Sequence, residues 1–300
     1  MKFSVVIPCF KSTAELNALV ADILSRYQEN CHEIILVQDG PDDDTFTRLQ
    51  DMSSKEERVR VIELDSNRGQ HHATLCGLQH ADASYSVITL DDDGQVQASE
   101  ISKLLAKARH TNADITYGLY TTRYHEGIRK VFSQYFSQVI SRYSNIPSQG
   151  SSFKLIAPRL VASVRSYSAS FVYLDEVLAW YSRSTVFTEV NHIPRPEGSS
   201  GYTWLKLIGL GWRIILNYTI LPYRLMLYGG LGLAIGSVIQ ARDKGVKFGQ
   251  LASSVENIPI GILVFFVLGF IMIAFGLVGS LQRKRKMEYP SRLNGQHVTS

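Results

Sequence analysis

Short apolar runs alternate with longer mixed stretches over the first 110 residues of the chain. The apolar runs are rich in β-branched and aliphatic residues, which is typical of strands, and they cover residues 3–7, 33–37, 59–64 and 85–90. The stretches between and after them are long enough for helices, which we expect near residues 14–27, 42–52, 70–81 and 100–108. This order predicts an α/β domain whose sheet is mostly parallel and covered by helices on both faces.

The end of the chain has a different pattern, because two long apolar stretches replace the alternation. Residues 258–281 carry no charge and, at about 1.5 Å per residue, are long enough to cross a hydrocarbon layer of about 30 Å. The stretch 221–239 has Arg224 as its only charge. Its glycines would allow close helix contact, and they are Gly229, Gly230, Gly232 and Gly236. We expect a transmembrane hairpin over 221–282; the alternative is a buried soluble helix pair, since Arg224 is costly in lipid.

The charges next to these stretches indicate an orientation. Four basic residues, 283–286, follow the last stretch, and the positive-inside rule places such a segment in the cytoplasm. Two spans would return the first 200 residues to the same side of an inner, multi-pass membrane protein. Residues 201–220 mix tryptophan, aliphatic and basic side chains as an interfacial amphipathic helix does. We therefore expect an α/β domain over 1–200, a juxtamembrane helix, the hairpin and a basic cytoplasmic tail over 283–300.

Composition supports this compartment. The chain is 45% hydrophobic with a formal net charge of +4, which predicts a folded core and not a disordered chain. Its cysteines, Cys9, Cys31 and Cys76, are odd in number and lack a C-x-x-C spacing, so we expect neither a disulfide framework nor a zinc site. Reduced thiols fit the cytosol. The first apolar run is too short for a signal peptide, and we expect no nucleic-acid partner.

Acidic residues follow two of the expected strands. Asp39 ends the second, and Asp91, Asp92 and Asp93 end the fourth. In an open parallel sheet, ligands bind at the carboxyl ends of the strands, so both acidic ends could face one crevice. Residues 42–44 are instead interpreted as a turn and a helix cap.

The triple acid is a candidate metal site. Asp91 and Asp93, with the amide oxygen of Gln95 nearby, are hard oxygen ligands that suit Mg²⁺ or Mn²⁺ bridging substrate phosphates. A solvated acidic turn explains the same residues equally well. The chain has no GxxxxGK[ST] motif, so a P-loop nucleotide site is not expected.

Six segments, taken in order, carry a resemblance to a known family: VVIPCFKSTAEL, LVQDGPDDDT, NRGQHHATLCG, TLDDDGQ, YGLYTTR and RPEGSSGY. They resemble the family 2 inverting glycosyltransferases of the polyprenyl-phosphate branch, over residues 3 to about 225. The resemblance implies a GT-A fold, a UDP- or GDP-sugar donor, a polyprenyl phosphate acceptor, a Mg²⁺ or Mn²⁺ cofactor and inversion at C1. We also expect a homo-oligomer that supplies a lipid-linked sugar for cell-envelope glycan or lipopolysaccharide.

The resemblance implies roles for matching residues of the donor site. Pro8 would line the nucleotide pocket, and Asp39 would bind the base or ribose. Asp91, Asp93 and Gln95 would hold the metal on the diphosphate. Arg195, which opens R-x-x-G-x-S-x-Y, would contact the phosphates of the nucleotide and neutralise the leaving group.

Other residues are candidates for the acceptor site and for the base. Arg129 and Ser133, four residues apart as on one helix face, resemble the positions that receive the lipid phosphate, and Arg123 is a cation close by. An ordinary solvated helix face is the alternative. Asp175, paired with Glu176, is where we expect a base, with a helix-surface position as the alternative. A polyprenyl phosphate is already an anion at neutral pH, because the second pKa of a monoester is about 6, so little base catalysis is needed.

The chain departs from the family pattern at several positions. Gln38 stands where a first acid is common, Tyr120 where an arginine often closes Tyr-Gly-x-Arg, and Lys154 where arginine is usual, which replaces a bidentate fork with a point charge. His71 and His72 open an expected helix, where backbone amides could bind the diphosphate or the histidines could simply be solvated.

Three alternatives to a polyprenyl-phosphate glycosyltransferase are open. A processive polysaccharide synthase would need more spans and a Q-x-x-R-W motif, which the chain lacks. A transferase for soluble sugars or proteins would not need the hairpin. A non-enzymatic, nucleotide-binding membrane protein would leave the acidic strand ends without a purpose.

Overall fold

The computed structural model describes residues 1–12, 14–120, 151–193, 209, 212–213, 215–217, 219–244 and 260–293. The chain forms two compact units, Met1–Thr203 and Trp204–Ser300. The expected juxtamembrane helix over 201–220 lies largely outside the described residues.

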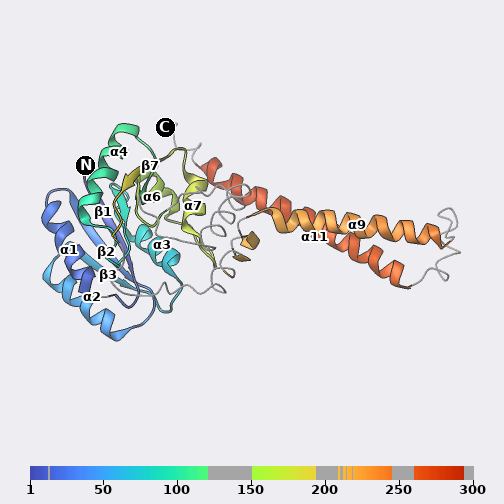
Figure 1. Ribbon diagram of the computed structural model, residues 1–300, viewed down its shortest axis with the longest axis horizontal. Helices are drawn as coiled ribbons and strands as arrows, with labels where there is room; N and C mark the ends of the chain where they lie inside the picture. The colour runs from blue at the N-terminus through green and yellow to red at the C-terminus, as the bar shows by residue number, and fades with distance from the viewer. Residues whose placement is uncertain are drawn as a thin grey trace. The chain divides into compact units, whose positions relative to one another are not determined.

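The first unit is built on one seven-stranded sheet, with the order β3-β2-β1-β4-β6-β5-β7 (Figure 1). The strands are β1 (Phe3–Cys9), β2 (Cys31–Gln38), β3 (Val59–Glu63), β4 (Ser86–Thr89), β5 (Ile115–Tyr120), β6 (Lys154–Ile156) and β7 (Thr185–Val190). All neighbouring pairs are parallel except those of β6, which runs antiparallel to both β4 and β5. The predicted mostly parallel sheet is confirmed, and β6 is the exception to it.

Helices cover both faces of this sheet, as predicted. The first four expected helices are present as α1 (Ala14–Arg26), α2 (Asp43–Lys55), α3 (Gln70–His80) and α4 (Ile101–Thr111), the last preceded by the 3₁₀ helix η1 (Ala98–Glu100). Two further helices, α6 (Pro158–Val164) and α7 (Leu174–Tyr181), follow β6. The helices α1, α2 and α4 lie on one face, and α3, α6 and α7 lie on the other (Figure 1).

The core is organised around β1, in which every residue is buried. Phe3, Val5 and Ile7 pack into the large apolar cluster beneath α1 and α4. On the opposite face, α3 lies unusually close to the strand. A Cβ atom on Gly77 would lie 2.3 Å from Cγ1 of Val6, so only glycine allows this approach. The first turn of α3 is thereby fixed over the carboxyl end of the sheet.

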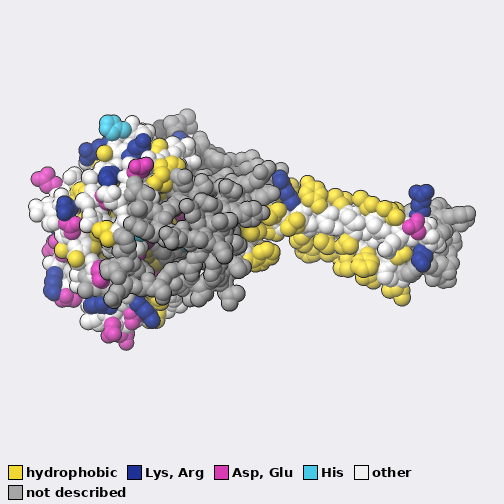
Figure 2. Space-filling model, viewed as in Figure 1, with side chains coloured by type: hydrophobic (Ala, Val, Ile, Leu, Met, Phe, Trp, Pro, Cys, Tyr) yellow, Lys and Arg dark blue, Asp and Glu magenta, His cyan; other side chains and the backbone are white. Residues whose placement is uncertain are grey.

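The second unit contains α9 (Leu221–Asp243) and α11 (Ile260–Leu293), which pack against each other. Both are long and apolar enough to cross a membrane, and only 17% of the residues in each apolar window are buried. Hydrophobic side chains make up much of the visible surface of this hairpin (Figure 2). Such outward-facing apolar helices differ from the mostly buried core helices of a soluble protein, and favour the predicted membrane hairpin over its alternative.

Glycine contacts bring the two helices together, although not all those expected. A Cβ on Gly230 would lie 2.6 Å from the carbonyl oxygen of Gly269, and a Cβ on Gly269 would lie 2.8 Å from that of Gly230. Gly232 and Gly236 have open space where a Cβ would be, so their predicted role in close helix contact is wrong. A Cβ on Gly229 would lie 3.3 Å from Cε of Met272, a tight approach to the end of a flexible side chain.

Candidate functional site

Three parallel strands end at one edge of the sheet and bring the acidic residues to it. Asp39 follows β2, and Asp91 follows β4 after Leu90. Because β6 runs antiparallel beside β4, with Lys154 paired to Thr89, the start of β6 lies at the same edge. The polar residues that precede and open β6 therefore face the acids that follow β4.

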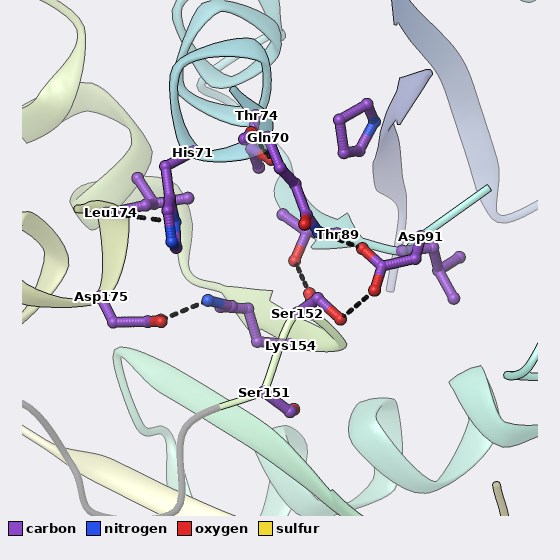
Figure 3. Close-up of a pocket in the computed structure, with 12 residues that line it drawn as sticks. Gln70, His71, Thr74, Thr89, Asp91, Ser151, Ser152, Lys154, Leu174 and Asp175 are labelled. Carbon is purple, nitrogen blue, oxygen red and sulfur yellow. Dashed lines mark hydrogen bonds and ion pairs between the residues drawn. The ribbon is translucent and has the colours of Figure 1, made fainter. Parts of the chain in front are cut away.

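A cavity of about 210 Å³ opens at this edge (Figure 3). Its walls come from the ends of β1 and β4, the first turn of α3, the start of β6 and the start of α7. The lining residues are Pro8, Gln70, His71, Thr74, Thr89, Leu90, Asp91, Ser151, Ser152, Lys154, Leu174 and Asp175. Three of the predicted site residues, Pro8, Asp91 and Asp175, share this cavity, and most of the others that line it are polar.

Asp91 is held by two neutral donors inside the cavity. Its Oδ1 accepts a hydrogen bond from the amide of Gln70, and its Oδ2 accepts one from Oγ of Ser152 at 2.6 Å (Figure 3). Burial, together with the neighbouring charges of Asp93 and Asp92, raises the pKa of Asp91 to about 6, although the Ser152 hydrogen bond lowers it. A cation at this carboxylate would relieve that unfavourable charge.

The other two acids of the triplet have different surroundings. Asp92 Oδ2 accepts hydrogen bonds from the backbone N–H of Phe10, at 3.2 Å, and from Oγ of Ser12, so it ties the acidic loop to the segment after β1. Burial raises the pKa of Asp92. Asp93 Oδ1 accepts the backbone N–H of Gln95 at 3.1 Å, in a turn where Gly94 has a φ of +66°. Asp92 thus stabilises the loop, which leaves Asp91 and Asp93 as the metal-ligand candidates.

Asp39 is buried and organises the loop before α3. Its Oδ1 accepts the backbone N–H groups of Arg68, at 2.7 Å, and of Gly69, at 3.2 Å. Gly40 follows with a φ of +95°, and a Cβ there would lie 2.6 Å from the backbone nitrogen of Asn67. Two of the amides before α3 are therefore bound to Asp39, while its expected contact with a base or ribose stays a prediction.

A buried ion pair forms the floor of the cavity. Lys154 Nζ donates to Oδ1 of Asp175, and the hydroxyl of Tyr117 donates to the same oxygen at 2.8 Å. The side chains of Lys154 and Asp175 are only 3% and 9% exposed. Burial by itself would raise the pKa of Asp175, but the positive charge of Lys154 and the two hydrogen bonds hold this pKa below its ordinary value. The helix-surface alternative for Asp175 is wrong, and its role as a base stays a prediction.

His71 forms the opposite wall. Its Nδ1 accepts the backbone N–H of Leu174 at 3.4 Å, and its ring lies 4.6 Å from the ring of Tyr173. Burial lowers the pKa of His71 to about 4. Because its ring contacts the backbone N–H of Leu174 and the ring of Tyr173, His71 is not the freely solvated histidine of the alternative. The next residue, His72, lines a separate cavity of about 270 Å³ on the other side of α3.

Several sequence predictions fall elsewhere. Arg123, Arg129, Ser133 and Arg195 lie outside the described residues, so their roles stay predictions. Gln38, in place of the usual acid, is buried and donates from Nε2 to the carbonyl of Asp42 at 3.0 Å. Tyr120, in place of the usual arginine, packs against His192 in a tilted arrangement with ring centroids 4.3 Å apart, and its hydroxyl lies 3.5 Å from Oγ of Ser152.

The acidic loop fits a hard divalent cation with few protein ligands. Among the described residues, no three His, Cys, Asp or Glu side chains converge as a closed metal site. Asp91 and Asp93, which are separated by Asp92, offer carboxylate oxygens, and Gln95 offers an amide oxygen. Mg²⁺ and Mn²⁺ commonly bind to one or two carboxylates, with water and substrate phosphate as the remaining ligands. The donor set and the raised pKa of Asp91 are both consistent with such a cation.

The fold and the site together define a glycosyltransferase of the GT-A kind. Residues 4–162, more than half of the chain, match the family model described as Glycosyl transferase family 2. The chain therefore belongs to this family, which confirms the resemblance seen in the sequence motifs.

The chain is similar to curated proteins over nearly its whole length. It is 27% identical over 286 residues to the undecaprenyl-phosphate 4-deoxy-4-formamido-L-arabinose transferase of Proteus mirabilis, covering 93% of this chain and 87% of that protein.

Two solved structures share its fold. A mannosyltransferase from Pyrobaculum calidifontis, in complex with GDP-Man and Mn²⁺, has a TM-score of 0.50 at 13% identity, covering 93% of this chain and 87% of that one. A glucosyl-3-phosphoglycerate synthase from Mycobacterium tuberculosis, in complex with Mn²⁺, UDP and phosphoglyceric acid, has a TM-score of 0.50 at 16% identity, covering 72% and 76%.

Proposed function

We propose that this protein transfers a sugar from a nucleotide-sugar to polyprenyl phosphate at the cytoplasmic face of the membrane, with inversion at C1. The observation that carries the proposal is the presence, in one chain, of a family 2 glycosyltransferase unit and two membrane-length apolar helices. A polyprenyl acceptor is confined to the bilayer, so an enzyme attached to the membrane meets it there. The similarity to a transferase named for undecaprenyl phosphate supports the same acceptor.

The donor would bind at the carboxyl edge of the sheet. Pro8 and Asp39 would contact the nucleoside. Asp91, Asp93 and Gln95 would hold Mg²⁺ or Mn²⁺ on the diphosphate, and a bound cation would neutralise the negative charge that develops on the leaving group. The Mn²⁺ complexes of the two solved structures support a divalent cation.

The acceptor needs positioning more than deprotonation. Its phosphate oxygen is already anionic near neutral pH, because the second pKa of a phosphate monoester is about 6. Asp175 stays ionised, but its Oδ1 already accepts hydrogen bonds from Lys154 and Tyr117. This geometry favours a role for Asp175 in fixing Lys154 over a role in removing a proton.

Cationic residues would complete the site. Arg195 would neutralise the diphosphate of the donor, and Arg129, Ser133 and Arg123 would receive the lipid phosphate. The product, a lipid-linked sugar, would serve cell-envelope glycan or lipopolysaccharide modification, and the enzyme would work as a homo-oligomer of the inner membrane.

The test is a transfer assay in detergent with undecaprenyl phosphate. Nucleotide donors of glucose, N-acetylglucosamine, mannose and 4-deoxy-4-formamido-L-arabinose are supplied in turn, with Mg²⁺, Mn²⁺ or EDTA. We expect one donor to give a lipid product of inverted anomeric configuration, and EDTA or Asp91→Ala to abolish it. Turnover on a soluble acceptor with none on undecaprenyl phosphate would contradict the proposal.

A further inference from the structure

The hydroxyl groups around the 210 Å³ cavity donate their hydrogen bonds to the protein itself. Thr74 donates to the carbonyl of Gln70 at 2.8 Å, Ser151 to that of Gly118 at 2.7 Å, Ser152 to Asp91 at 2.6 Å, and Thr89 to the carbonyl of Ser152. The amide of Gln70 also donates to Asp91. These side chains supply acceptor oxygens to a ligand, while most of their donor capacity is already used.

His71 differs from these side chains. A neutral imidazole carries one hydrogen, and Nδ1 of His71 already accepts the N–H of Leu174 at 3.4 Å, which places that hydrogen on Nε2. No group among the described residues forms a hydrogen bond with Nε2. The contact with Leu174 and the ring of Tyr173 fix the plane of the imidazole. The cavity therefore contains a donor that is fixed in orientation and available to a ligand.

The surroundings of His71 favour an uncharged ligand. The side chain extends from α3 towards Lys154 and Asp175, which neutralise each other (Figure 3). Asp91, on the other side of the cavity, would repel a phosphate that is not bound through a cation. The oxygen of a sugar hydroxyl or acyl group carries no such charge. It can accept from His71 and, where it is a hydroxyl, donate to the acceptor oxygens nearby.

We propose that His71 binds the sugar that is transferred, by donating a hydrogen bond from Nε2 to one oxygen atom of that sugar. The assignment rests on the proposed function, because it requires a nucleotide-sugar whose diphosphate lies near Asp91. The contact fixes the sugar relative to the acidic loop. The preference of the enzyme among donor sugars then depends on whether the sugar carries that oxygen.

Two substitutions of His71 distinguish the role of Nδ1 from the role of Nε2. The side-chain amide of asparagine reaches about as far as Nδ1, so His71→Asn can keep the contact with Leu174 and loses the Nε2 donor. The amide nitrogen of glutamine reaches about as far as Nε2, so His71→Gln can keep the donor. His72→Asn is the matched control, because His72 is the neighbour on the same helix and lines the other cavity.

Binding is measured for the wild type and the variants with UDP-glucose, UDP-N-acetylglucosamine, GDP-mannose and UDP-4-deoxy-4-formamido-L-arabinose, and with UDP and GDP alone. With the donor that the wild type binds, we expect His71→Asn to weaken binding about ten-fold, and His71→Gln and His72→Asn about two-fold or less. Binding of the nucleoside diphosphate alone should not change in any variant, which also shows that each variant is folded.

A donor lacking one sugar oxygen tests the direct contact. The deoxy analogue that lacks the contacted oxygen should bind the wild type about ten-fold more weakly than the parent donor does. To His71→Asn, which has already lost the contact, the analogue and the parent donor should bind equally well. Equal losses for the nucleotide-sugar and the nucleoside diphosphate in His71→Asn would refute the assignment while leaving the proposed function intact. If the wild type binds none of the four donors, the proposed function fails and the assignment fails with it.

Discussion

Removing one partner of the buried Lys154–Asp175 pair should destabilise the first unit strongly, and removing both should not. In Asp175→Asn, the ammonium of Lys154 stays 3% exposed without a counter-charge, while the hydroxyl of Tyr117 keeps an acceptor. Breaking a buried ion pair from one side typically costs about 3–5 kcal/mol, whereas replacing both charges with apolar groups is often nearly neutral. We therefore expect a loss of about 3 kcal/mol or more for Asp175→Asn and for Lys154→Met. The double variant Lys154→Met/Asp175→Leu should lose about 1 kcal/mol or less.

Trp180 offers a local probe for this measurement. It lies five residues after Asp175 in α7, and its Nε1 donates to Oε1 of Glu176 at 2.9 Å. Replacing Trp204 and Trp212 by phenylalanine leaves Trp180 as the only tryptophan of the chain. The free energy of unfolding is then obtained from its fluorescence during a urea titration of the full chain in detergent. A loss below about 1 kcal/mol for Asp175→Asn, or additive losses in the double variant, would refute the pairing as the source of stability.

Three further predictions concern charge and packing elsewhere. Because the pKa of Asp91 is raised to about 6 from an ordinary value of about 3.9, its ionised form costs the metal-free fold about 2–3 kcal/mol above pH 6, and this cost is relieved as the pH falls towards 4. In EDTA at pH 8, Asp91→Asn should therefore raise the free energy of unfolding by about that amount, and in an assay with Mg²⁺ or Mn²⁺ it should abolish transfer; unchanged stability would contradict the raised pKa. Gly230→Leu should separate the hairpin helices, measured as faster proteolysis in detergent, whereas Gly232→Leu should not; equal effects would contradict the observed contact. Arg129→Ala should raise the KM for polyprenyl phosphate about ten- to hundred-fold, and Arg195→Ala that for the nucleotide-sugar, and a reversed pattern would place the acceptor elsewhere.

The sequence predicts those elements whose pattern is local. The runs that became β1 to β4 are short and largely apolar, and the stretches between them are long enough for helices, so most boundaries fall within a few residues of the prediction. The uncharged run that became α11 is equally clear. By contrast, β6 has three residues and is a strand only because β4 and β5 lie on either side of it. No local pattern marks such a strand, or the reversal of direction that brings its first residue to the acidic edge.

The site shows the same limit. Asp39 and Asp91 could be predicted at one edge, because parallel strands share their carboxyl ends. The pairing of Lys154 with Asp175 could not, since the two residues are 21 positions apart and join only through the fold. An acid at the start of an amphipathic helix has the same local pattern whether it is solvated or buried. Likewise, the rotation of α9 about its axis decides that Gly230 faces α11 and Gly232 does not. The number of glycines in the sequence does not indicate this rotation.

The contact of Gly77 with Val6 gives the two walls of the cavity different freedom to change during evolution or engineering. The wall formed by α3 cannot be moved by a single substitution at that contact without a clash, because the helix already lies as close to β1 as a glycine permits. The opposite wall depends on residues 151–154, which precede and open a strand of three residues. A library of variants that seeks new sugar preferences should therefore keep Gly77 fixed and vary the side chains at positions 151 and 152. Side chains of a different size at these two positions disturb the packing of the core least.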